Sequence, residues 1–124
     1  MRVLLDTHYL LWIDTGVPLP GDARELLDQA EEVCVSVVSF VEVAIKASLG
    51  RLPTRPEPLW VLVEQSQMSL LPIEVAHTAR LTDLPHHHRD PFDRLLIAQA
   101  QVEGMVLLTA DRQLEPYGYP VRRI

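Results

Sequence analysis

The sequence contains very little lysine or cysteine and no long apolar run. Lys46 is the only lysine among 11 basic residues and the net charge is −6, which disfavours nucleic-acid binding through bulk positive charge. The single Cys34 cannot form an internal disulfide, and its β-branched surroundings predict a buried, unreactive thiol. No apolar run approaches the roughly 18 residues that span a bilayer, and MRVLLDTH turns acidic before a signal-peptide core develops. These absences predict a cytoplasmic protein with no membrane partner.

The composition is that of a globular domain. Of the 124 residues, 48% are hydrophobic and 23% charged, enough to bury a core without disulfides. Short β-branched or leucine-rich runs alternate with amphipathic stretches, a pattern typical of repeated βα units. We therefore expect one domain, residues 1–124, of the α/β class: a three-layer α/β/α sandwich with a mostly parallel central sheet.

The predicted elements follow this alternation. Strands are expected at residues 2–5, 33–38, 70–73, 105–109 and 119–122. Helices are expected just after Asp6 and at residues 22–32, 40–49, 59–67, 74–83 and 91–103. Gly50 and Gly104 follow two of these helices, where a left-handed C-cap belongs.

The stretch RDPFDRLLIAQA, residues 89–100, opens an apolar helix with two aspartates. Asp90 precedes a proline, which predicts that it is the N-cap. Asp93 falls at the third helical position, where an acid also suits a capping box and the helix dipole. However, the residues three, four and seven positions further on are apolar, so Asp93 leads a stripe that should be buried. Asp93 is therefore either a second cap or a functional group.

Four acids lie where a predicted strand ends or a predicted helix begins. Asp6 ends the first strand, Asp111 follows a late strand, and Glu42 and Asp93 are expected in the first turns of helices. Strand ends and the helix starts that follow them share one edge of a parallel sheet, where ligands bind. Each acid has a local explanation as well: Asp6 and Asp111 as caps, and Glu42 as a surface i,i+4 partner of Lys46. Together, crowded carboxylates repel one another unless a cation offsets the repulsion, so the set favours a metal site.

The predicted donors are all oxygen atoms. Such a set selects Mg²⁺, with Mn²⁺ as a substitute, over zinc, which prefers histidine or cysteine. A bound ion of this kind lowers the pKa of a water and stabilises charge on a phosphoryl oxygen. The chemistry implied is phosphodiester hydrolysis.

Four segments carry a resemblance to a known family: LLDTHYLLW, SFVEVAIKASLGRL, HRDPFDRLLIAQA and LLTADRQL. They resemble the PIN-domain family, specifically the VapC-type toxin ribonucleases of bacterial toxin–antitoxin pairs. The resemblance covers nearly the whole chain and all four acids in order. It implies that Asp6, Glu42 and Asp93 coordinate the metal and that Asp111 completes the site as a ligand or water-orienting group. Asp90 also matches the family pattern, and we interpret it as the cap that positions Asp93.

The same resemblance implies an activity and partners. We expect a Mg²⁺-dependent endoribonuclease whose metal-activated water cuts RNA to leave a 5′-phosphate and a 3′-hydroxyl. The expected partners are the RNA substrate, a cognate antitoxin protein and a second copy of the chain in a homodimer. Apolar candidates for the antitoxin contact fit an ordinary core equally well: Leu11, Trp12, Trp60 and Val63.

Several neighbouring residues have two interpretations each. The hydroxyls of Thr7, Ser39 and Thr109 either orient water and ligands or cap backbone groups. A substrate-binding rim is expected to include Arg89, Arg94 and Arg112, which are otherwise surface arginines. The run His86, His87 and His88 is a solvated loop, a phosphate contact or a site for a softer metal.

Rival functions remain open at this point. A metal-independent nuclease would use His8, His77 or the histidine run as acid and base, and a catalytically inactive PIN-like module would keep the acids only for docking. A receiver-like domain would need a lysine after a late strand, whereas Lys46 lies early in the chain. A phosphatase-like enzyme would need aspartate where His8 stands.

Overall fold

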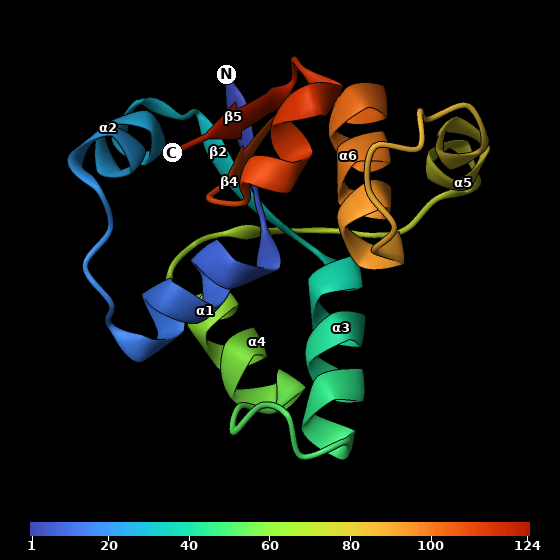
Figure 1. The fold of residues 1–124 in the computed structure, drawn as a ribbon. Helices are drawn as coiled ribbons and strands as arrows, with labels where there is room; N and C mark the ends of the chain where they lie inside the picture. Colours follow the sequence, from blue (N-terminus) through green and yellow to red (C-terminus); the bar gives the residue numbers. More distant parts are fainter.

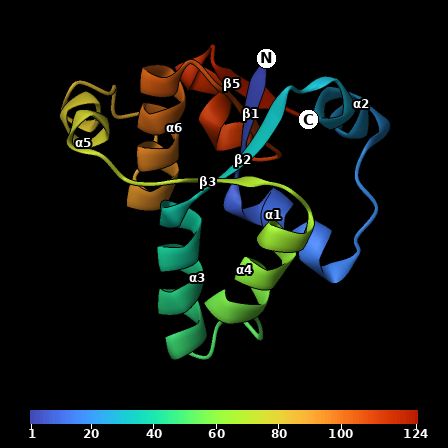
Figure 2. The same cartoon turned by 180° about the vertical axis from the view of Figure 1, so that it is seen from behind.

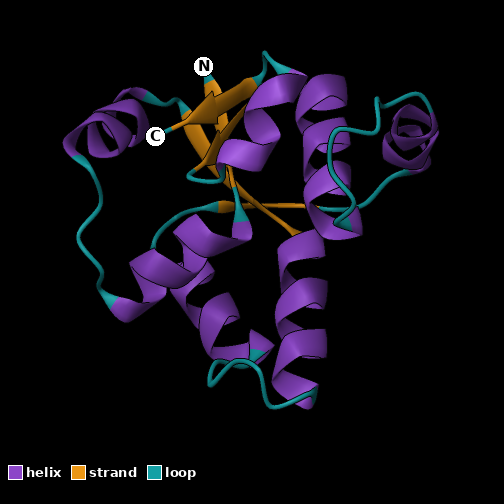
Figure 3. Cartoon of the chain, viewed as in Figure 1, coloured by secondary structure: helices purple, strands orange, loops and turns teal.

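The computed structural model describes all 124 residues, and its five strands form one sheet in the order β3-β2-β1-β4-β5 (Figures 1 and 3). The strands are β1 (Arg2–Leu5), β2 (Glu32–Ser36), β3 (Ser69–Leu71), β4 (Val106–Thr109) and β5 (Val121–Arg123). The helices are α1 (Thr7–Thr15), α2 (Gly21–Gln29), α3 (Val37–Ser48), α4 (Pro56–Gln65), α5 (Val75–Thr82), α6 (Pro91–Glu103) and the 3₁₀ helix η1 (Arg112–Tyr117). Every strand pairing is parallel, which confirms the predicted α/β class.

The side chains of alternate strand residues pack into different halves of the core. Val3 and Leu5 of β1 face the half built with α1, α2 and α4, whereas Leu4 faces the half built with α6 and η1. Both halves consist of buried, mainly aliphatic side chains on the two sides of the sheet. The two views show α2 on one side of the sheet and α6 and α5 on the other (Figures 1 and 2). The sheet is therefore the middle layer of three.

The strand order reverses between β1 and β4. The chain runs outward from β1 to β2 and β3, then crosses back to place β4 beside β1, with Leu5 opposite Leu108. In open parallel sheets, ligands bind outside the carboxyl ends of the strands at such a reversal. This is where Asp6 and Thr109 lie, at the ends of β1 and β4.

Several element boundaries differ from the sequence prediction, and one of them moves a site residue. The helix expected at 22–32 ends at Gln29, because Ala30 is extended and the chain enters β2 two residues later. The strand expected to reach residue 38 ends at Ser36, whose hydroxyl accepts a hydrogen bond from Val38 N at 3.0 Å and begins α3 at once. Glu42 therefore lies in the second turn of α3, and the prediction of a first-turn position was wrong.

The remaining elements lie close to their predicted positions. The strand at 2–5 and the helix at 91–103 match residue for residue. Gly50 and Gly104 have φ of 70° and 66°, the left-handed conformation predicted for helix ends. Helix α4 begins three residues earlier than expected because Pro56 supplies its first turn. None of the helices combines the length and apolar character needed to cross a membrane.

Candidate active site

The first turns of α1, α3 and α6 meet at the carboxyl edge of the sheet. In Figure 1 the start of α3 lies beside the start of α6, just beyond the end of β1. The hydroxyls of Thr7 in α1 and Ser39 in α3 are 2.9 Å apart and buried, which joins two of these helix starts. This arrangement brings acids from distant parts of the chain to one place.

Asp6 occupies the deepest position. Its residue is only 2% exposed, and its backbone N–H donates to Leu108 O at 2.9 Å. Oδ2 accepts a hydrogen bond of 2.7 Å from Thr109 Oγ1, whereas Oδ1 is buried without a partner. The side chain makes no capping hydrogen bond to α1, so the cap interpretation does not account for it. Burial raises the pKa of Asp6 above its usual range, and the Thr109 bond opposes this increase.

Glu42 is the second buried acid, at 3% exposure. Oε2 accepts a hydrogen bond of 2.6 Å from Lys46 Nζ, and Oε1 is buried without a partner. The predicted i,i+4 pair is present, but the prediction that it lies on the helix surface was wrong, because this turn of α3 faces the sheet edge. A buried carboxylate with one unsatisfied oxygen is costly for the fold.

The sequence left open whether Asp93 is a second helix cap or a functional group, and the structure distinguishes it from Asp90. Asp90 Oδ1 accepts hydrogen bonds from Phe92 N at 2.8 Å and Asp93 N at 3.1 Å, which confirms the N-cap. The Asp93 carboxylate instead bonds a side chain, with His88 Nε2 at 3.0 Å from Oδ2. Burial and the nearby Asp6, Asp90 and Glu42 carboxylates raise the pKa of Asp93 to about 7. Asp93 is therefore crowded by charge of its own sign.

Asp111 lies at the start of η1 and is the last of the four acids. Its Oδ1 caps the 3₁₀ helix by accepting from Gln113 N at 2.9 Å, and its own N–H donates to Thr109 Oγ1 at 3.1 Å. Asp93, Asp111 and His88 each offer a ligand atom, and these atoms lie within 4.8 Å of one another. The structure thus brings two of the four predicted acids into one group with His88. Asp6 and Glu42 lie outside that group but raise the pKa of Asp93 electrostatically.

These residues fit a divalent cation. The unpartnered oxygens Asp6 Oδ1 and Glu42 Oε1 belong to side chains that are almost fully buried. No protein donor bonds these two oxygens. Hydrogen bonds from water would not reduce the mutual repulsion of several carboxylates, whereas a cation does. Carboxylate oxygens are also the donors that hard divalent ions prefer.

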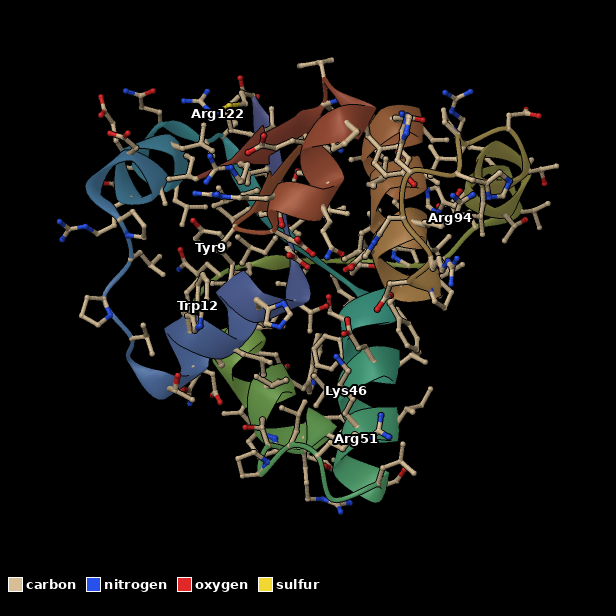
Figure 4. The ribbon with its side chains drawn as sticks, viewed as in Figure 1. Tyr9, Trp12, Lys46, Arg51, Arg94 and Arg122 are labelled. Carbon is tan, nitrogen blue, oxygen red and sulfur yellow. The ribbon has the colours of Figure 1, made fainter.

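Arg94 lies in the interior and not at the surface, so the prediction for this residue was wrong. We expected it at a substrate-binding rim, yet its residue is 8% exposed. Its guanidinium donates to Pro85 O at 2.8 Å, Leu84 O at 3.3 Å and Tyr117 Oη at 3.2 Å. Figure 4 shows Arg94 on the side of α6 that faces the loop after α5. Arg94 therefore holds this loop, and its apolar neighbours in the sequence gave no sign of those backbone acceptors.

The structure separates His88 from the rest of the histidine run and places Lys46 close to the candidate site. The run was interpreted as a solvated loop, a phosphate contact or a site for a softer metal, and His86 and His87 are exposed as in a solvated loop. His88 instead points at Asp93. Lys46 was recognised only as a surface partner of Glu42, although it also lies close enough to Asp90 and Asp93 for their charges to raise its pKa. Burial, which decides both roles, was not readable from the local pattern.

His77 does not fit the role of a catalytic base. It is 0% exposed, its Nδ1 accepts from Glu74 N at 3.0 Å, and its Nε2 lies 3.0 Å from Glu103 Oε1. Glu103 is the last residue of α6, whereas Asp93 lies in the first turn of that helix. His77 therefore serves the packing of α5 on α6, and the rival assignment of acid–base chemistry to it was wrong.

Comparisons with known proteins agree with this architecture. The PIN domain family model matches residues 3–118. Ribonuclease VapC22 of Mycobacterium tuberculosis is 30% identical over 121 residues, covering 95% of this chain and 93% of that protein. Among solved structures, VapBC2 from Rickettsia felis bound to a promoter DNA fragment has a TM-score of 0.73 at 14% identity, covering 99% of this chain and 98% of the other. DNA-bound VapBC from Salmonella typhimurium has a TM-score of 0.72 at 19% identity, covering 100% and 97%.

Proposed function

The chain belongs to the PIN-domain family, in its VapC type, and from this premise we propose that it is a metal-dependent endoribonuclease, the toxin of a toxin–antitoxin pair. One observation carries the proposal: Asp6 Oδ1 and Glu42 Oε1 are buried without partners at the sheet edge that also carries Asp93 and Asp111. The relative is named a ribonuclease, and the similar structures are described as VapBC complexes. Both support the activity and the partner class.

Asp6, Glu42, Asp93 and Asp111 are the residues that would hold Mg²⁺, with Mn²⁺ as a substitute. When bound, such an ion supplies a water of lowered pKa and stabilises negative charge on a phosphoryl oxygen. In the overall reaction the water oxygen bonds to phosphorus, the bond from phosphorus to the 3′-oxygen breaks, and that oxygen takes up a proton. The products are a 5′-phosphate and a 3′-hydroxyl.

The chain's own residues prepare the site for this reaction. Thr109 fixes both Asp6 Oδ2 and the backbone of Asp111, so one hydroxyl sets the spacing between the ends of β1 and β4. Lys46 Nζ donates to one oxygen of Glu42 and so offsets part of its charge, and the Lys46 side chain is 34% exposed. Preorganised charges of this kind are the main source of rate enhancement in phosphoryl chemistry.

An apolar groove supports the proposal of an antitoxin partner. Val37 and Phe40 of α3, Trp60 and Val61 of α4, and Leu70 of β3 line a groove of about 500 Å³. Trp60 is 40% exposed, whereas Val63, another candidate from the sequence, is buried in the core at 1%. We propose that an apolar segment of the antitoxin covers this groove, and that the chain also forms a homodimer, which light scattering of the purified protein tests.

The chemistry of the cut ends separates this function from its alternatives. The purified chain should convert a mixed RNA pool into fragments with 5′-phosphates that a 5′-phosphate-dependent exonuclease degrades. A histidine-based nuclease would leave cyclic phosphate or 3′-phosphate ends instead. A catalytically inactive PIN-like module would give no fragments while still binding its partner, and either result would overturn the proposal.

A further inference from the structure

We propose that His88 is a metal ligand of this site, so that the centre is a mixed imidazole–carboxylate site and not the all-carboxylate site expected from the sequence. The inference rests on the proposed function in that both require a divalent ion at the acidic edge. It goes further by assigning a nitrogen ligand to that ion. The ligand would come from the loop between α5 and α6, which carries none of the four predicted acids.

The position of the imidazole supports a direct bond. His88 Nε2 lies 3.0 Å from Asp93 Oδ2, and ligand atoms of His88, Asp93 and Asp111 all lie within 4.8 Å of one another. Two ligands bound at about 2.1 Å to one ion are at most about 4.2 Å apart, so only a small inward movement closes this group on an ion. The side chains of His88 and Asp93 are 16% and 14% exposed, which leaves the group reachable from solvent.

Contacts of the loop fix the backbone at His88. His88 N donates to Tyr117 Oη at 3.1 Å, and the same hydroxyl accepts from Arg94 Nη1 at 3.2 Å. Arg94 also donates to two carbonyls of the loop, those of Leu84 and Pro85. The His87 ring packs edge-on against Tyr117, with centroids 4.9 Å apart. An ordered backbone at this position limits where the His88 side chain can point, as the preorganisation of a metal ligand requires.

A second observation points to a cation beside this group. Asp6 Oδ1 and Glu42 Oε1 are unpartnered, and both side chains are more than nine-tenths buried. Thr109 Oγ1 links Asp6 to the group, because it donates to Asp6 Oδ2 at 2.7 Å and accepts from Asp111 N at 3.1 Å. The buried Asp6 carboxylate is therefore one hydroxyl group away from a member of the group, and its charge and that of Glu42 both raise the pKa of Asp93.

A nitrogen ligand changes the expected metal preference. Imidazole suits nickel, zinc, iron and copper, whereas carboxylates and water suit Mg²⁺ and Mn²⁺. The prediction of Mg²⁺ came from an all-oxygen donor set. With His88 included, the site should favour transition metals over Mg²⁺ more strongly than four carboxylates would.

Electron spin-echo spectroscopy of bound Mn²⁺ tests the assignment without relying on activity. The full chain is loaded with Mn²⁺ and examined for ¹⁴N modulation, with His88→Gln as the variant and the exposed His86→Gln as the control. We expect ¹⁴N modulation in the wild type and in His86→Gln, and its loss in His88→Gln while Mn²⁺ is still bound. Incorporation of ¹⁵N-histidine should replace the ¹⁴N pattern in the wild type.

Titrations with Ni²⁺ and Mg²⁺ give a second readout. His88→Gln should weaken Ni²⁺ binding at least about tenfold, the scale on which metal-site contacts act, and affect Mg²⁺ binding much less. Bound Mn²⁺ without ¹⁴N modulation in the wild type, or modulation that persists in His88→Gln, would overturn the role of His88 and leave the acidic site intact. No Mn²⁺ binding at all would overturn the proposed function together with it.

Discussion

Thr109 Oγ1, at the end of β4, donates a 2.7 Å hydrogen bond to Asp6 Oδ2, at the end of β1. The residues are 103 positions apart in the chain, and the bond crosses the point where the strand order reverses. The same oxygen accepts from the backbone N–H of Asp111 at 3.1 Å. One hydroxyl thus links Asp6, the most buried acid of the site, to Asp111.

Thr109→Val removes this hydroxyl and keeps the shape of the side chain. The change removes the only side-chain hydrogen bond that Asp6 accepts, so we expect a loss of about 1–3 kcal/mol of stability and weaker Mn²⁺ binding. Urea unfolding and Mn²⁺ titration measure the two effects. Thr78→Val is the matched control, because Thr78 bonds only a carbonyl of its own exposed helix turn. Equal stability and Mn²⁺ affinity in the Thr109 variant and the wild type would contradict the role given to this bond.

Lys46→Met tests the charge balance at Glu42. The substitution keeps the apolar stem but leaves the Glu42 carboxylate buried without any partner, so the metal-free protein should lose about 1–3 kcal/mol of stability, the cost of an unsatisfied buried acceptor. Because no ammonium then competes for Glu42, Mn²⁺ should raise the melting temperature by more than it does in the wild type. Arg51→Met, at an exposed position near the end of α3, is the control (Figure 4). If Lys46→Met and the wild type had the same melting temperature in chelator, the Glu42–Lys46 pair would contribute nothing to stability.

Arg94→Met separates a structural role from substrate binding. Arg94 donates three hydrogen bonds to the loop after α5 and to Tyr117, so its loss should cost about 2–4 kcal/mol of stability, and Arg94→Lys should not restore all three bonds. The exposed Arg89→Met should change stability by less than about 0.5 kcal/mol. A stable Arg94→Met protein with weakened RNA binding would instead favour the rim position first expected from the sequence.

The stability of the metal-free protein should depend on the protonation of Asp93. Its pKa is about 7, raised from 3.8 by burial and by neighbouring carboxylates. Between these two values the folded state binds more protons than the unfolded state, so this contribution to stability is fully present below pH 4 and is lost as the pH rises through 7. Asp93→Asn should remove this dependence and be more stable than the wild type at pH 8, by up to about 4 kcal/mol.

Urea unfolding in chelator from pH 4.5 to 8 measures this difference. Comparison of the two proteins at each pH cancels the titration of groups that do not interact with Asp93. The gap between Asp93→Asn and the wild type should widen as the pH rises. A gap that is constant across this range would mean that Asp93 has an ordinary pKa.

The sequence predicted the elements well where a local rule decides them. Asp90 followed by proline determined the start of α6, and β-branched runs located the strands. Ser36 shows the limit of this reasoning: the run continues through Val37 and Val38, and only the capping hydrogen bond of the folded chain ends the strand there. A serine inside a β-branched run did not reveal that it was a cap.

Four acids could be assigned to one edge of the sheet because parallel topology requires it. Their different environments could not be predicted, since burial and partners come from residues far away in the chain. Asp6 depends on Thr109, and Asp93 depends on His88, whose own position depends on Tyr117. The orientation of His88 toward Asp93 and the burial of Arg94 depend on tertiary contacts. No hydrophobic periodicity in the sequence indicates either of them.

Cleavage of a mixed RNA pool tests the central claim most directly. The wild type, Asp6→Asn, Asp93→Asn and the control Asp28→Asn, an exposed acid on α2, are compared with Mg²⁺, with Mn²⁺ and with excess chelator. We expect the wild type and Asp28→Asn to cut RNA with either metal, chelator to abolish cutting, and both site variants to lose at least about 10²-fold in rate. Cutting that persists in chelator and in both site variants would contradict the account and remove the acidic edge from the chemistry.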